Sequence, residues 1–168
     1  MKRPNKKESF KLKEYDEDHN GLMSYTRDSI IDLLNEYALL TSKLFRKMHY
    51  NMSLSLYNYN SIKGSSIVTI ENRKECIGFV SYSIDENDKR VMIHQLHIDK
   101  NHKRLGWGSK LVRYLFIKYS NYQFEVPYVI SNNFESVVFW KSLGFIQPVH
   151  CSFVTYPTEI IPEEPLED

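Results

Sequence analysis

Two glycines stand where a hydrophobic strand gives way to a helical stretch, and this junction constrains the fold more than any other feature of the sequence. The strand ends near Ile98, a basic loop follows, and Gly106 and Gly108 begin a helical periodicity that reaches Tyr119. The unpaired N–H groups of a helix's first turn, together with the helix dipole, favour an anion. Glycines at this point let a phosphate approach the backbone, so the junction predicts a pyrophosphate site.

Two other phosphate motifs are excluded by the residues that follow. A dinucleotide fingerprint needs a third glycine three positions after Gly108, where this chain has Leu111. A Walker loop needs Gly-Lys followed by Ser or Thr, whereas the order here is Gly108-Ser109-Lys110. A glycine-rich turn that only lets a helix pack closely remains the alternative at this point.

Hydrophobic periodicity predicts an α/β chain of the α+β type. The predicted strands cover residues 10–15, 67–70, 76–84, 90–98, 126–130, 145–146 and 152–156, and the predicted helices cover 26–48, 106–119 and 133–144. The first helix is expected to break near Leu40–Ser42. This order predicts a mixed, mostly antiparallel central sheet of six to seven strands, with helices on both faces. The crossover after the strand 90–98 predicts a parallel pair that splays apart locally.

Length and composition indicate one globular domain. A chain of 168 residues, 42% hydrophobic and 26% charged, can bury a core without cross-links. We expect the domain to span residues 1–157, with a basic start at 1–8 and an acidic tail at 158–168. A net charge of +1 gives no general attraction to nucleic acid or to a membrane surface. Cys76 and Cys151 form no metal-ligand spacing, and both are expected to be reduced.

Two segments, in this order and at this spacing, resemble the motifs of the GCN5-related N-acetyltransferase (GNAT) superfamily. The first is Lys103-Arg104-Leu105-Gly106-Trp107-Gly108, close to the family's acetyl-CoA signature Gln/Arg-x-x-Gly-x-Gly/Ala but with lysine at its first position. The second runs from Asn133 through Phe139 and Trp140 to Phe145, beside the family's Asn-x-x-Ala-x-x-Phe-Tyr-x-x-x-Gly-Phe. The resemblance spans residues 67–146.

The resemblance implies a GNAT-like fold that uses acetyl-CoA as cosubstrate and no metal. The pantetheine arm would pair with the strand backbone at residues 96–98, and the pyrophosphate would lie on the amides of residues 104–109. Lysine at position 103 keeps the positive charge but lacks the planar fork of arginine, so altered phosphate contacts are expected. The cofactor-binding residues implied in this way are Leu96, His97, Ile98, Lys103, Arg104, Leu105, Gly106, Trp107, Gly108, Ser109, Asn133 and Phe139.

The reaction asks for a base, because an ammonium group must lose its proton before the amine attacks a thioester. His94 on the central strand is the candidate, since a neutral imidazole accepts a proton near pH 7, and Gln95 could orient substrate or water. By simple alternation His94 shares a strand face with Met92 and Leu96, whereas His97 faces the other way and contributes only its backbone. The alternative for each of these residues is an ordinary structural role as a polar residue of the strand.

Many relatives protonate the leaving thiolate with the tyrosine of their Phe-Tyr pair, and Trp140 stands at that position here. An indole N–H donates a hydrogen bond but is not a usable acid. Tyr128, on the strand after the crossover, is the leading substitute, although an aromatic core residue would look the same in sequence. Otherwise the thiolate leaves unprotonated, or activity is lost.

The expected function is direct acetyl transfer, without an acyl-enzyme, from acetyl-CoA to a primary amine. A protein N-terminus or lysine is favoured as acceptor over a small-molecule amine, and a tyrosine-rich loop (Tyr50, Tyr57, Tyr59) could wall the acceptor pocket. The alternatives are an acyl-CoA-binding module without turnover and an unrelated α/β phosphate binder. No apolar run approaches the ~20 residues of a membrane span. The charged start predicts an intracellular protein, cytoplasmic or nuclear. We expect it to act as a monomer or homodimer.

Overall fold

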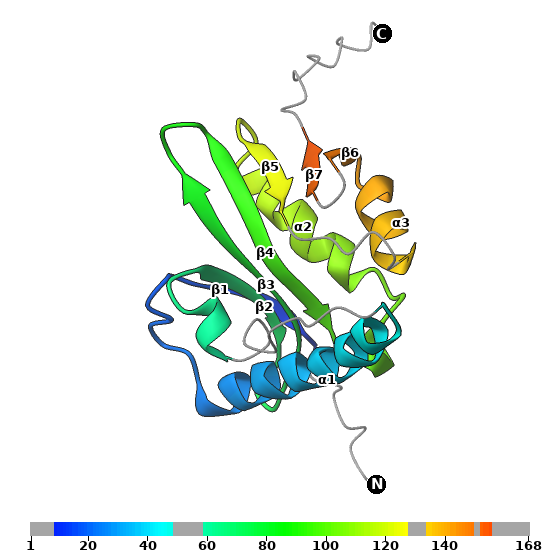
Figure 1. Ribbon diagram of the computed structural model, residues 1–168. Coiled ribbons are helices and arrows are strands. Elements are labelled where there is room, and N and C mark those ends of the chain that lie inside the picture. Colours follow the sequence, from blue (N-terminus) through cyan, green and yellow to red (C-terminus); the bar gives the residue numbers. More distant parts are fainter. Residues whose placement is uncertain (1–8, 49–58, 128–133, 150–151, 156–168) are drawn as a thin grey trace, which may run out of the picture.

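The chain is built on a mixed sheet, seen in a computed structural model that describes residues 9–48, 59–127, 134–149 and 152–155 (Figure 1). Within these residues the sheet has seven strands in the order β1-β2-β3-β4-β5-β7-β6. The strands are β1 Lys11–Tyr15, β2 Ser66–Glu71, β3 Cys76–Asp85, β4 Arg90–Ile98, β5 Gln123–Val126, β6 Ile146–Val149 and β7 Ser152–Thr155. The helices are α1 Ser24–Met48, α2 Trp107–Lys118 and α3 Phe134–Ser142, with short 3-10 turns η2 Tyr59–Ile62 and η3 Lys100–His102.

Strand pairing confirms the predicted sheet. β1 to β4 pair antiparallel in sequence order, β4 and β5 pair in parallel, and β7 pairs antiparallel with both β5 and β6. The parallel pair is joined through α2, as the crossover predicted. The place of β7 between β5 and β6 had no signal in the sequence, because pairing between distant strands leaves no local periodicity.

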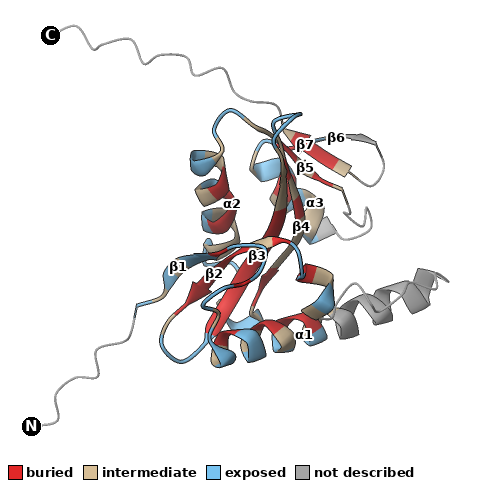
Figure 2. Cartoon of the chain, turned by 90° about the vertical axis from the view of Figure 1, so that its left-hand side faces the viewer, coloured by how far each residue is buried: buried red, intermediate tan, exposed pale blue. Residues whose placement is uncertain are grey.

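Helices cover the two sides of the sheet, and Figure 2 shows α1 and α2 on opposite sides of β2 to β4. We call these sides the α1 face and the α2 face. On the α2 face, Val80, Tyr82 and Ile93 join a buried cluster that includes Leu111 of α2 and Trp140 of α3. On the α1 face, Phe79 of β3 packs with the smaller cluster around Ile30, Leu33 and Leu34 of α1. This burial agrees with the hydrophobic periodicity that predicted a helix at residues 26–48.

A buried carboxylate fastens the start of α1 to the sheet. The side chain of Glu71, with no exposed surface, accepts hydrogen bonds from Tyr15, Thr26 and Thr69 and pairs with Lys13 at 2.6 Å. A buried charge is tolerated only when it is paired and hydrogen-bonded, and here each partner comes from a segment that must meet the others. The network therefore fixes β1, β2 and α1 in one arrangement.

Two predicted boundaries are wrong. α1 runs unbroken from Ser24 to Met48, so the expected break near Leu40–Ser42 is absent. The strand expected at 126–130 begins earlier, at Gln123, because the chain needs only a short turn after α2. Residues 128–133, the basic start at 1–8 and the acidic tail at 158–168 lie outside the described residues.

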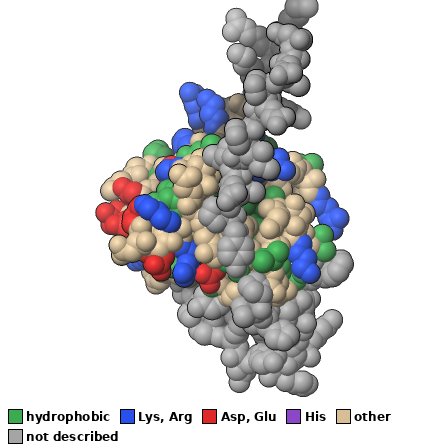
Figure 3. Space-filling view, turned by 90° about the horizontal axis from the view of Figure 1, so that it is seen from above, with side chains coloured by type: hydrophobic (Ala, Val, Ile, Leu, Met, Phe, Trp, Pro, Cys, Tyr) green, Lys and Arg blue, Asp and Glu red, His purple; other side chains and the backbone are tan. Residues whose placement is uncertain are grey.

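Charged side chains of the described residues are interspersed on the surface. On the face seen in Figure 3, Lys and Arg lie among Asp and Glu rather than in one large patch of a single sign. Among the described helices, none is long and apolar enough to cross a membrane.

Candidate active site

The parallel pair β4–β5 is hydrogen-bonded along only its first part. The paired positions are Arg90 with Gln123, Val91 with Phe124 and Met92 with Glu125. β4 then continues to Ile98, and no described strand pairs with residues 93–98 on that edge. Backbone N–H and C=O groups require partners, so an amide-bearing ligand laid along this edge would satisfy them. The opening of the parallel pair is the one that the sequence predicted.

A β-bulge interrupts β4 next to the point where this pairing stops. Opposite β3, Gln95 faces Ser81 and Ile93 faces Tyr82, so His94 is an extra residue with no position of its own. A bulge breaks the alternation of side chains along a strand. The consecutive side chains of His94 and Gln95 therefore both turn toward the α1 face.

The bulge corrects two expectations drawn from simple alternation. His94 shares the α1 face with Met92, but Leu96 lies on the α2 face, where it packs beside Gly108 of α2. His97 does not face away from His94, because its ring contacts Tyr37 of α1. The polar side chains of β4 thus gather on one face instead of alternating.

Within the described part of the chain, the ring of His94 makes one hydrogen bond. Its Nε2 lies 2.8 Å from Oγ of Ser83, which stands on the neighbouring strand. Burial lowers the pKa of His94 below its usual value of 6.5, because desolvation disfavours the charged ring. The imidazole is therefore neutral near pH 7 and able to accept a proton.

Gln95 and His97 belong to a second chain of hydrogen bonds on the same face. The amide nitrogen of Gln95 donates to Ser61 of η2 at 2.6 Å, and its Oε1 lies 2.9 Å from Nε2 of His97. The ring of His97 is packed against Tyr37 at 4.1 Å and Phe79 at 5.3 Å between centroids. Burial, with a smaller contribution from the charge of Lys103, lowers the pKa of His97 to about 3. The ring of His97 is therefore neutral near pH 7 and packed among side chains of the α1 face.

The start of α2 forms an open cradle at the end of the same strand. Gly106 precedes the helix with a left-handed φ of 82°, and no side chain caps the helix start. The first bond of the helix runs from the N–H of Lys110 to the carbonyl of Gly106, which leaves the N–H groups of residues 107–109 for another acceptor. A Cβ on Gly106 would meet nothing within 4 Å. The backbone is thus open to an incoming anion.

Gly108, the second glycine, is needed for close packing rather than for open space. A Cβ on Gly108 would stand 3.3 Å from the ring of Phe139 and 3.7 Å from Leu96. Gly108 therefore lets α3 pack closely against α2, which is the packing role weighed for the glycine pair from sequence. Of the two glycines, Gly106 is the one that leaves space beside the helix start.

Two cations flank the cradle. Nζ of Lys103 lies 5.1 Å from the centre of the Tyr37 ring, so the lysine of the first motif is directed toward α1. Arg104, with a φ of 61°, extends an exposed side chain that pairs with Glu135 of α3 at 2.8 Å. Leu105 between them and Gly106 is 67% exposed.

The aromatic pair of α3 faces inward. Trp140 is 4% exposed and lies against Phe139 and Phe145 at 4.9 and 5.1 Å between ring centroids. Its indole is part of the core. Tyr128 and Asn133, the other residues proposed from sequence, lie outside the described residues.

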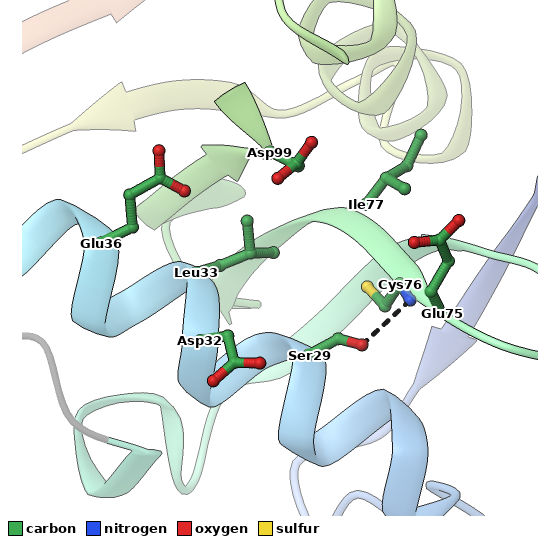
Figure 4. A pocket seen from close by; sticks show the side chains of 8 residues that line it. All are labelled: Ser29, Asp32, Leu33, Glu36, Glu75, Cys76, Ile77 and Asp99. Carbon is green, nitrogen blue, oxygen red and sulfur yellow. Dashed lines mark hydrogen bonds between the residues drawn. The ribbon is translucent and has the colours of Figure 1, made fainter. Parts of the chain in front are cut away.

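A shallow cavity of about 170 Å³ lies elsewhere on the α1 side (Figure 4). It is lined by Ser29, Asp32, Leu33 and Glu36 of α1, by Glu75, Cys76 and Ile77, and by Asp99. Asp99 lies five residues beyond His94, about 16 Å along an extended strand, so the cavity does not include the candidate base. Burial raises the pKa of the Cys76 thiol to about 12, so this thiol stays protonated near pH 7. No group of three or more His, Cys, Asp or Glu in the described part of the chain is arranged to hold a metal ion.

Three contributors to this region were missed from sequence: Ser83, Ser61 and Tyr37. The hairpin register places Ser83 opposite Met92, and both strands of this hairpin were predicted. The bulge that brings His94 to Ser83 has no residue signature, so that partner could not be found in advance.

Comparison with known proteins gives a consistent result. The family model described as "Acetyltransferase (GNAT) family" matches residues 28–145. No curated protein matches the chain in sequence. Among solved structures, aminoglycoside 6'-acetyltransferase type Ii is similar, with a TM-score of 0.63 and 14% identity, covering 87% of this chain and 96% of that one.

Two further structures share the fold. Tetrahymena GCN5 aligns with a TM-score of 0.61 and 14% identity, covering 89% of this chain and 96% of that one. The ribosomal-protein-S18-alanine N-acetyltransferase from Escherichia coli aligns with a TM-score of 0.57 and 12% identity, covering 86% and 91%. At these identities the likeness concerns the fold alone.

Proposed function

Because this chain belongs to the acetyltransferase (GNAT) family, we propose that it transfers an acetyl group from acetyl-CoA directly to a primary amine, without an acyl-enzyme. One observation carries the proposal. The strand β4 holds a neutral histidine at its bulge and leads, through the loop at residues 99–105, to the open helix start at Gly106. A base and an anion cradle thus lie along one unpaired strand edge.

The residues present fit the cofactor. The uncapped N–H groups at the start of α2 and the open space beside Gly106 suit a pyrophosphate. We propose that the amides of residues 104–109 hold it, and that Lys103 and Arg104 add charge by turning toward it from their present contacts with Tyr37 and Glu135. The free edge of β4 at residues 96–98 offers partners to an amide-rich arm, and Phe139 lies beside that edge next to Leu96.

Acetyl-CoA supplies an acetyl group that is already activated as a thioester, so the protein needs mainly to position the groups and move protons. His94 is suited to take the proton of the incoming ammonium, because its ring is neutral and lies on the α1 face. Gly108 and Leu96, beside the cradle, lie on the α2 face. We therefore expect the amine to approach from the α1 face, opposite the side on which the cofactor's phosphates are held.

The proton donor for the leaving thiolate remains a proposal from sequence. Trp140 is buried and cannot serve, so Tyr128 keeps that role in our scheme. The burial of Trp140 also favours the second candidate function, an acyl-CoA-binding module with weak or no turnover. Release of free thiol from acetyl-CoA in the presence of an amine separates the two.

The acceptor is proposed to be a protein N-terminus or a lysine, with a small-molecule amine as the alternative. The similar structures are named for different acceptors, an aminoglycoside in one and an alanine of a ribosomal protein in another. The shared fold therefore does not choose between them. A panel containing peptides with free N-termini, lysine peptides and aminoglycosides tests the choice.

The cofactor site is tested with two glycines of the same geometry. Gly106 and Gly21 both have a left-handed φ, and a Cβ on either would meet nothing within 4 Å. Gly106→Ala should therefore cost as much backbone strain as Gly21→Ala, but only Gly106→Ala places a methyl group at the cradle. We expect at least a tenfold loss of CoA affinity, about 1.4 kcal/mol, for Gly106→Ala alone, measured by calorimetry. Equal affinities for both variants would place the cofactor elsewhere.

A further inference from the structure

The hydroxyl of Ser83 occupies one nitrogen of the candidate base. Oγ of Ser83 and Nε2 of His94 lie 2.8 Å apart, and among the described residues Ser83 is the only hydrogen-bond partner of that ring. A neutral imidazole has one nitrogen that donates and one that accepts. Since Nε2 is engaged by Ser83, only Nδ1 is left to meet a substrate, and Nδ1 accepts a proton only when Nε2 carries the hydrogen.

We propose that Ser83 is a positioning residue that accepts the Nε2–H of His94 and so keeps Nδ1 as the basic nitrogen. This rests on the proposed function, in which His94 takes the proton of the amine. Once that proton has moved to Nδ1, the ring is charged and its Nε2–H donates a stronger, charge-assisted bond to Ser83. Ser83 thus sets the tautomer before the transfer and stabilises the imidazolium after it.

The hydrogen bond to Ser83 is the main interaction through which the protonation of His94 can be changed. Among the described residues, the other titratable or charged side chains on the α1 face near β4 include His97, Tyr37, Lys103 and the ion pair of Arg90 with Glu125, which stands beside Met92. Burial alone lowers the pKa of His94, with no contribution from a neighbouring charge. Removing the acceptor of Nε2–H should therefore lower the pKa of His94 further, because the charged ring loses the hydrogen bond that Ser83 accepts.

A matched control stands two residues away on the same strand. Ser81 lies on the same face as Ser83 and is fully buried, and in the described part of the chain its hydroxyl has no hydrogen-bond partner. Ser81→Ala deletes the same atom as Ser83→Ala without breaking a bond. Ser83→Thr keeps a hydroxyl at the position and provides the conservative variant.

The kinetic experiment compares these three variants with the unmodified protein, using acetyl-CoA and its best amine acceptor. Ser83→Ala should lower kcat about tenfold with KM for acetyl-CoA unchanged, consistent with the loss of one positioning contact in general base catalysis. The acid limb of its pH–rate profile should move to lower pH. Ser83→Thr should retain most of the rate, and Ser81→Ala all of it. A Ser83→Ala enzyme that behaves like Ser81→Ala would overturn the proposal.

A spectroscopic measurement decides the point even without turnover. Long-range 1H–15N spectra of 15N-histidine-labelled protein report the tautomer of each ring, with His94→Gln identifying the signal of His94. The proposal requires a hydrogen on Nε2 in the unmodified protein and a mixture of tautomers in Ser83→Ala. A hydrogen on Nδ1 in the unmodified protein would overturn it. Failure of the proposed function is separate: CoA would bind, and no amine would be acetylated.

Discussion

The two faces of β4 are built by different rules. On the α2 face Val91, Ile93 and Ile98 are buried in the cluster that α2 and α3 complete. On the α1 face the same strand presents His94, Gln95 and His97, each hydrogen-bonded to another side chain. A single β-bulge at His94 separates the two patterns, since it lets consecutive polar residues turn the same way.

The two faces of β4 differ in the kind of interaction that stabilises them. Apolar contacts on the α2 face are non-directional and depend on filling volume. Hydrogen bonds on the α1 face depend on exact partners and fix the orientation of each ring. β4 can therefore carry a reactive group on one face while its other face is packed in the core. If this is so, substitutions on the two faces should have separable effects.

The largest separable effect is expected on stability. Ile93→Ala, at a side chain only 1% exposed, should lower the free energy of unfolding by about 2–5 kcal/mol, because the cavity it leaves cannot close fully. Urea unfolding followed by circular dichroism measures the change. The shape of the pH–rate profile should stay that of the unmodified enzyme.

The control for this substitution is the neighbouring position on the other face. Met92 is part-exposed and precedes the bulge, so Met92→Ala should cost clearly less than Ile93→Ala. Equal losses for the two variants would mean that the α1 face is as tightly packed as the α2 face, and the comparison between the faces would fail.

The next effect is expected on turnover. His94→Gln can keep a hydrogen bond to Ser83 but cannot take a proton, so kcat should fall about 10²-fold. The acid limb of the pH–rate profile should disappear with it, because no imidazole remains to titrate. Stability should be nearly unchanged, since the ring is only partly buried. Steady-state kinetics across pH 5–9 with parallel unfolding curves make the measurement, and an unchanged rate would remove His94 from the mechanism.

These predictions show how far the sequence reaches. The hydrophobic periods of β3 and β4, the crossover and the glycine junction predicted a mixed sheet with an opened parallel pair, because those features depend on local spacing. The bulge was missed, since an extra residue in a strand leaves the composition unchanged. One missed bulge reversed the inferred faces of Leu96 and His97 relative to His94.

The two glycines show the same limit at a single junction. In sequence Gly106 and Gly108 are indistinguishable, and both were expected to admit a phosphate. Only the approach of Phe139, which is more than thirty residues later in the chain, separates packing at Gly108 from open space at Gly106. The local sequence was enough to locate the strand-to-helix junction. The separate roles of its two glycines depend on a long-range contact.

The smallest expected effect concerns His97, which lies on the polar face but behaves like a core residue. Burial lowers its pKa to about 3 in the folded chain, against 6.5 when unfolded. Between these values the unfolded chain binds a proton that the folded chain does not, so the stabilising contribution is complete above pH 6.5 and is lost as pH falls toward 3. At pH 5 the loss should be on the order of 2 kcal/mol relative to pH 7.

His97→Gln tests this, because glutamine is polar but does not titrate. Its free energy of unfolding should fall less than that of the unmodified protein between pH 7 and pH 5, with the difference near the value above. Equal slopes for the two proteins would mean that the ring of His97 is reached by solvent. The turnover of His97→Gln should also exceed that of His94→Gln, since the buried ring cannot exchange a proton with substrate. Two histidines three residues apart on one face would then differ in kind, one needed for proton transfer and the other for the pH range in which the fold holds.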